Sequence, residues 1–164
     1  MGTPFNSIYQ IFLSQIKIFD IAEVFTKAEK AYESGTLEEI ERAEASIKSI
    51  EDNMQYWLMS SIGHFGICRK DIRNPDVENA QFTEVLDIEE INILAKYMVY
   101  AYILTHVITE TNLRQSLNSK DYRVYSPANQ LKALQGLRDD IYKEASALQT
   151  KYSWNLRSTK EMFK

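Results

Sequence analysis

The sequence has very few of the side chains that carry metal-binding or nucleophilic chemistry. It contains one cysteine, Cys68, and two histidines, His64 and His106, in 164 residues. A single cysteine cannot form a disulfide within the chain, and these three residues lack the spacing of a recognised metal site. There is also no phosphate-binding glycine loop and no Gly-x-Ser-x-Gly nucleophile motif. We therefore expect no catalytic residues, no metal and no cofactor, and we predict that the protein is not an enzyme.

The sequence also lacks a basic cluster and a long uncharged apolar run. Its net charge is −4, and its 19 lysines and arginines are scattered, so it has no positive strip for nucleic-acid binding. The uncharged stretch 97–109 is bounded by Lys96 and Glu110 and is shorter than the roughly 20 residues that cross a membrane. With no recognisable secretion signal, the expectation is synthesis in the cytoplasm and no membrane association.

Core-forming residues are abundant. The chain is 45% hydrophobic and 12% aromatic, which is too rich in such residues for a disordered protein. A chain of this length can bury a substantial core as one domain. We predict a single helical domain over residues 1–152, followed by a C-terminal tail over 153–164.

Apolar residues at helical spacing predict an all-α bundle of four to five helices, two of them long. Two capping boxes, Thr36-x-x-Glu39 and Asp87-x-x-Glu90, mark helix starts. Prolines in the first turn mark two more, because proline is favoured there. The expected helices cover residues 5–18, 21–33, 36 to about 63, 88–116 and 127–152.

One stripe in the third of these helices has the spacing of a helix–helix seam. It is expected to pack within the chain, since it spans only about three heptads, too few to favour a coiled coil with another molecule. Its residues are Ile40, Ala43, Ile47, Ile50, Met54, Trp57 and Ser61.

Two short segments favour extended geometry. Residues 118–126 join the last two helices and carry Tyr122, Val124 and Tyr125, which are frequent in strands. Residues 82–85, with Phe82 and Val85, form another candidate strand. We predict that these two segments pair as a short two-stranded β flap.

Three segments together resemble the head–tail connector proteins of tailed bacteriophages, also called neck or adaptor proteins. They are residues 93–99 (ILAKYMV), 119–131 (SKDYRVYSPANQL) and 134–152, and the opening at 4–7 (PFNS) extends the similarity. The resemblance implies a helical protein that forms a ring, commonly of twelve subunits, beneath the portal around the DNA channel. It also implies a place in the neck of the virion, after assembly in the host cytoplasm.

In that interpretation the C-terminal tail reaches the portal protein, because aromatic and arginine side chains are frequent interface anchors. The expected portal-binding residues are Trp154, Leu156, Arg157, Met162 and Phe163. The expected subunit interface comprises Phe82, Val85, Tyr122, Val124 and Tyr125.

Other neck and tail proteins are further expected partners, and double-stranded DNA would pass without specific binding because an acidic chain does not attract phosphates. Three alternatives stay open. In the first, the tail folds back onto the bundle. In the second, the protein is a non-viral interaction or regulatory module that grips one partner. In the third, it is an enzyme with an unrecognised carboxylate site.

Overall fold

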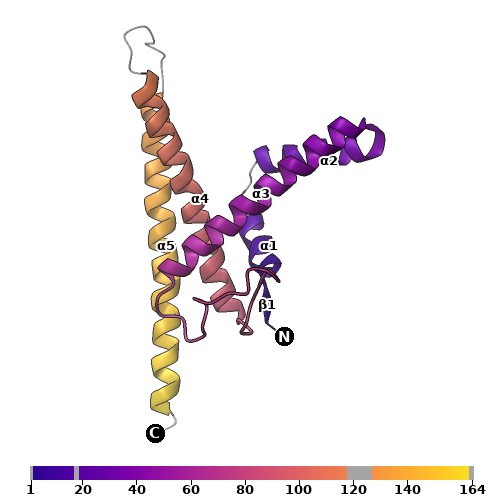
Figure 1. Ribbon diagram of the computed structural model, residues 1–164. Helices are drawn as coiled ribbons and strands as arrows, with labels where there is room; N and C mark the ends of the chain where they lie inside the picture. The colour runs from indigo at the N-terminus through magenta and orange to yellow at the C-terminus, as the bar shows by residue number, and fades with distance from the viewer. Residues whose placement is uncertain (1, 17–18, 118–126, 163–164) are drawn as a thin grey trace.

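The computed structural model describes residues 2–16, 19–117 and 127–162, and it has an all-α fold with one small sheet (Figure 1). The predicted fold class is confirmed, although three helices rather than two are long. The elements in chain order are β1 (Thr3–Pro4), α1 (Phe5–Gln15), α2 (Phe19–Ser34), α3 (Leu37–His64), β2 (Gln81–Phe82), α4 (Ile88–Leu117) and α5 (Pro127–Met162).

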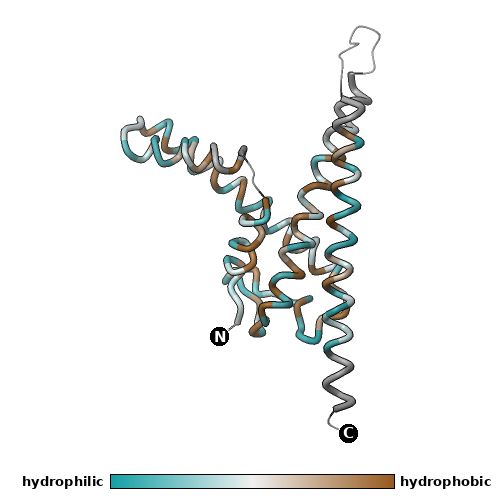
Figure 2. Tube along the Cα trace, turned by 180° about the vertical axis from the view of Figure 1, so that it is seen from behind, coloured by the Kyte–Doolittle hydropathy of each residue, from teal (hydrophilic) through white to brown (hydrophobic). Residues whose placement is uncertain are grey.

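Helix α4 lies at the centre of the bundle. It contacts α1, α3 and α5, and apolar residues gather where these helices meet (Figure 2). Leu94, Ala95 and Met98 are fully buried there. Because neighbours cover α4 on several sides, its middle must be apolar around most of its circumference.

By length and composition, residues Ile88–Thr109 of α4 could also cross a membrane. Half of that helix's most apolar window is buried inside the bundle. The central helix of a folded domain meets the same criteria of length and hydropathy. Packing against α1, α3 and α5 therefore accounts for the apolar character of α4.

Both predicted capping boxes are present. The Glu39 amide donates to Thr36 Oγ1 at 3.4 Å, and the Thr36 amide donates to Glu39 Oε2 at 2.7 Å. At α4 the Glu90 amide donates to Asp87 Oδ1 and the Asp87 amide donates to Glu90 Oε2, each at 2.9 Å. These bonds satisfy amides that a helix start leaves without intrahelical partners.

Helix α3 uses its seam within the chain, as predicted. Its C-terminal half packs into the bundle, where Trp57 and Met54 are buried and the Trp57 ring lies 5.7 Å from Phe12. Its N-terminal half packs with α2, which has its main contacts with α3. Residues 19–53 thus form a helical hairpin that projects from the bundle (Figure 1), and we call it the α2–α3 arm.

The two-stranded flap is also present, but β2 pairs with the N-terminus. Thr3 lies opposite Phe82 in antiparallel register with Pro4 opposite Gln81. The Leu86 amide donates to Thr3 Oγ1 at 2.7 Å, which ties the flap to the start of α4. The partner expected for β2, residues 118–126, lies outside the described residues.

Helix α5 is one continuous helix beyond the predicted domain boundary. The segment 153–162 continues α5 without a break. No glycine or proline follows Tyr152 to stop the helix. In Figure 1 the C-terminal turns of α5 extend past the other helices.

Candidate interaction surfaces

Trp154 is the predicted portal-binding residue whose side chain the structure locates. It is 65% exposed on α5, two residues after the buried Tyr152. Leu156, Arg157 and Met162 belong to α5, but their side chains, like all of Phe163, lie outside what the structure describes. An indole that is mostly in water at a projecting helix end is a suitable anchor for a partner.

The predicted subunit-interface residues are separated by the fold. Val85 is 64% exposed and available to a second molecule. Phe82 is fully buried, with its ring 5.2 Å from Phe5 in an edge-on contact. The assignment of Phe82 to a subunit surface therefore needs correction, because its side chain belongs to the chain's own core. Tyr122, Val124 and Tyr125 lie outside the described residues.

Glu90 is a buried carboxylate that connects three parts of the chain. Its side chain is 1% exposed. Tyr152 of α5 donates its hydroxyl to Glu90 Oε1 at 2.7 Å, and Lys70 Nζ lies 2.8 Å from Glu90 Oε2. The Tyr152 oxygen also accepts from the Arg69 amide at 3.3 Å. The cluster fastens α5 and the 65–72 segment to the start of α4.

Glu90 raises the pKa of both of its partners, Tyr152 and Lys70. Burial raises the pKa of Tyr152, and its hydrogen bond to Glu90 raises it further, so the phenol stays protonated as a donor. Burial acts to lower the pKa of Lys70, but the hydrogen bond and the charge of Glu90 outweigh it, and the pKa is raised overall. A buried carboxylate with a cation and several donors is compensated rather than reactive.

Within residues 2–16, 19–117 and 127–162, Glu90 does not line the small hollow that lies beside it. This hollow of about 180 Å³ is lined by its neighbours Glu89, Ile93 and Tyr152. Within the same ranges, no three His, Cys, Asp or Glu side chains are placed to hold a metal ion. The described geometry around Glu90 supports a structural role.

The two histidines contact aromatic rings. His64 stacks on Tyr97 with ring centroids 5.4 Å apart, and His106 meets Tyr102 edge-on at 4.4 Å. His106 is exposed on α4. Both residues contribute to side-chain packing at helix surfaces.

Cys68 has an unreactive environment. Burial raises the pKa of its thiol to about 11, and the negative charge of Glu90 adds to the effect. Since the thiolate is the reactive form, we expect iodoacetamide at pH 8 to alkylate Cys68 about 100-fold more slowly than an ordinary thiol. The rate should rise about tenfold per pH unit up to pH 11. Mass spectrometry of the alkylated protein measures this, with glutathione as the reference; equal rates would contradict the prediction.

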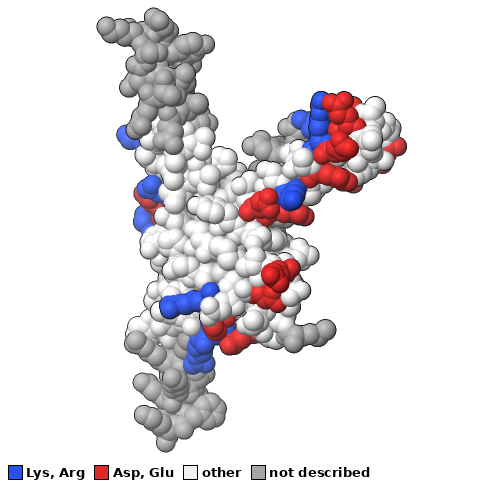
Figure 3. Space-filling model, in the orientation of Figure 1, with Lys and Arg blue, Asp and Glu red and all other residues white. Residues whose placement is uncertain are grey.

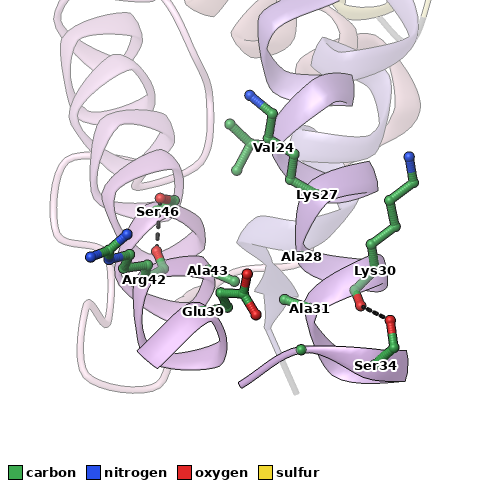
Figure 4. A pocket seen from close by; sticks show the side chains of 11 residues that line it. Val24, Lys27, Ala28, Lys30, Ala31, Ser34, Glu39, Arg42, Ala43 and Ser46 are labelled. Atoms are coloured by element: carbon green, nitrogen blue, oxygen red, sulfur yellow. Dashed lines mark hydrogen bonds between the residues drawn. The ribbon is translucent and has the colours of Figure 1, made fainter. Parts of the chain in front are cut away.

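The α2–α3 arm contains a groove of about 460 Å³ between its two helices (Figure 4). Its floor is made by small residues, Ala28, Ala31 and Ala43, which leave space between the helices. Figure 4 shows Glu39 directed into that space, whereas Lys30 and Arg42 point away from it. Sequence periodicity did not indicate this groove, because the alanines also fit an ordinary packed face.

The turn of the arm requires a glycine. Gly35 donates its amide to the Ala31 carbonyl oxygen at 2.9 Å. A Cβ at Gly35 would lie only 2.5 Å from that oxygen, closer than a side chain can approach without displacing the backbone. Gly35 therefore permits the short connection from α2 to α3.

Helices α4 and α5 are joined by specific polar contacts as well as apolar packing. Lys96 pairs with Glu144 at 2.6 Å, and the Tyr97 hydroxyl donates to Gln149 Oε1 at 2.7 Å. Ala145 is fully buried between these contacts.

Comparison of the chain with known protein families, with curated proteins and with solved structures finds no match.

Proposed function

We propose that the protein is a structural component of a tailed-phage virion, a head–tail connector that forms a ring beneath the portal around the DNA channel. The observation that carries the proposal is the exposed Trp154 on the projecting end of α5, held by the buried Tyr152. The segments 93–99 and 134–152 that resemble connector proteins fall in α4 and α5, which pack against each other. This pairing would present the tail as a rigid docking element.

The proposed partners are the portal protein, other neck and tail proteins, and further copies of the chain, in a ring of about twelve subunits by the family resemblance. The chain's net charge of −4 suits a channel wall along which DNA slides. An acidic wall does not bind the DNA phosphates, so it does not release the counterions whose release drives phosphate binding. The proposed location is the virion neck, with assembly in the host cytoplasm. Glu90 is fully compensated by its neighbours, which supports a structural rather than a catalytic role.

Removing the tail should abolish portal binding. We expect a variant lacking residues 154–164 to fail to co-sediment with portal rings, because it loses the exposed anchor Trp154. The variant keeps Tyr152, so the contact between α5 and Glu90 stays intact. Trp154→Ala should weaken binding about 30-fold, the loss typical of an interface hot spot. Native mass spectrometry and sedimentation measure both effects.

The matched control is Tyr56→Ala, since Tyr56 is an equally exposed aromatic residue on α3. It should bind portal rings like the unaltered protein. Undiminished binding by the tail deletion would refute portal docking through α5.

The groove in the α2–α3 arm favours one alternative, a non-viral interaction or regulatory module that grips a single partner. That function predicts a one-to-one or two-fold complex in native mass spectrometry. A connector predicts a many-membered ring on the portal.

A further inference from the structure

Charge is unevenly divided along the chain. Residues 19–64, which form α2 and α3, contain ten acidic and four basic residues, a net charge of −6. Residues 127–164, which include α5, contain seven basic and four acidic residues, a net charge of +3. The arm end of α2 and α3 projects away from α5 in Figure 1, whereas the C-terminal end of α3 contacts α5 through His64 and Tyr142. One copy therefore carries an acidic surface and a basic surface that do not neutralise each other.

The acidic surface is the solvent side of α3 in the α2–α3 arm. Glu41, Glu44 and Asp52 are exposed, and at 3.6 residues per turn they lie away from the seam that faces α2 and the bundle. The exposed Lys48 lies among them. The charge of the fourth carboxylate, Glu51, acts on Tyr9 of α1. None of the four carboxylates joins an ion pair within the described residues. Figure 3 shows acidic side chains over this arm with several basic side chains among them. Leu37, which is 74% exposed, adds an apolar contact at its tip.

The basic surface is the outer face of α5. Lys132, Lys143 and Lys151 are exposed and lie opposite the buried side of the helix. Asp139 and Asp140 are exposed on the same side, and Asp139 pairs with Arg138 at 2.6 Å. Lys143 has a weak, exposed pair with Asp140 at 3.3 Å. Lys132 and Lys151 form no ion pair within the part of the chain that the structure describes. Beside these lysines, Leu137 and Leu148 are partly exposed apolar residues.

We propose that the acidic face of the α2–α3 arm docks on the outer face of α5 in a second copy of the chain. The proposal rests on the proposed ring and names the surfaces that build it. The two faces differ, so the contact is head-to-tail, which closes into a ring when the rotation between copies permits. Charge complementarity identifies the occupant. The exposed carboxylates of the arm, which form no ion pair within the described residues, repel nucleic acid and attract the lysines of α5.

The test is a charge exchange between two variants. In the first, Glu41→Lys and Glu44→Lys make the arm basic; in the second, Lys132→Glu and Lys151→Glu make α5 acidic. Each variant alone presents two faces of like charge. A one-to-one mixture in which the two variants alternate restores opposite charges at every contact. The basic arm of the first variant meets the acidic α5 of the second, and the unaltered arm of the second meets the unaltered α5 of the first.

We expect each variant alone to lose at least tenfold in assembled material, with and without portal rings. The mixture should regain assembly with alternating subunits, measured by native mass spectrometry and sedimentation velocity at low ionic strength. Added salt should weaken the unaltered assembly, because salt screens exposed charges. Recovery in the mixture also shows that both variants are folded.

The control variant Glu78→Lys with Glu89→Lys makes the same change in net charge as the first exchange variant, at exposed positions outside the arm. It should assemble like the unaltered protein. Rings that form equally well from either exchange variant would overturn the arm contact and leave the connector function standing. If the unaltered protein gives only one-to-one or two-fold complexes with portal rings, or none, both proposals fail.

Discussion

Replacing Glu90 with alanine should lower the free energy of unfolding by about 3 kcal/mol or more, the loss typical of breaking a buried charged pair on one side. The substitution leaves the Tyr152 hydroxyl and the Lys70 ammonium without the carboxylate they share. It also removes one half of the capping box at α4. For a chain of this size the melting temperature should fall by about 10 °C.

Glu89→Ala is the matched control, because Glu89 occupies the same helix turn but is exposed. It should change the free energy of unfolding by no more than about 0.5 kcal/mol. Urea denaturation of both variants, combined with Tyr152→Phe in a double-mutant cycle, isolates the Glu90–Tyr152 coupling. Equal stability of the Glu89 and Glu90 variants would show that the buried carboxylate contributes nothing.

Truncating Phe12 to alanine should cost about 3–5 kcal/mol of unfolding free energy. Phe12 is fully buried between Trp57, 5.7 Å away, and Tyr102, 6.3 Å away, measured between ring centroids. Helix α1 has 11 residues and is too short to be stable alone. Loss of this anchor should therefore loosen α1 from α3 and α4, which near-ultraviolet circular dichroism would detect.

Phe25→Ala provides the comparison for Phe12. Phe25 is 42% exposed on α2, so its truncation removes less buried surface and should cost no more than about 1 kcal/mol. Guanidinium unfolding of the two variants gives the difference directly. A loss below 1 kcal/mol for Phe12→Ala would mean that α1 is held mainly by the flap and by Ile8.

The helices could be predicted because their starts carry local signals. Thr36 and Asp87 begin capping boxes whose partners lie three residues away, so the sequence alone reveals them. The end of α5 could not be predicted as well. An absent stop signal after Tyr152 is weaker information than a glycine or proline would be.

The contacts that were missed join residues far apart in the chain. Glu90 has the same local pattern as a solvent-exposed capping residue, and its burial depends on Tyr152, 62 positions later. Phe82 was correctly placed in a strand, but the segment that covers it begins at Thr3. Spacing along the sequence cannot reveal such partners, since tertiary packing decides between exposure and burial. For the same reason the tail could be identified as apolar, but not as the extension of α5.

The fastening of Tyr152 to Glu90 has a mechanical consequence. It lies immediately before the projecting turns of α5, so a pull on those turns would reach the centre of the molecule through a phenol and a carboxylate. The hydrogen bond at 2.7 Å and the nearby Lys70 would bear that load before the long helix could peel away from its neighbour. The C-terminal turns of α5, held at Tyr152, would therefore keep one direction relative to the bundle when force is applied to them.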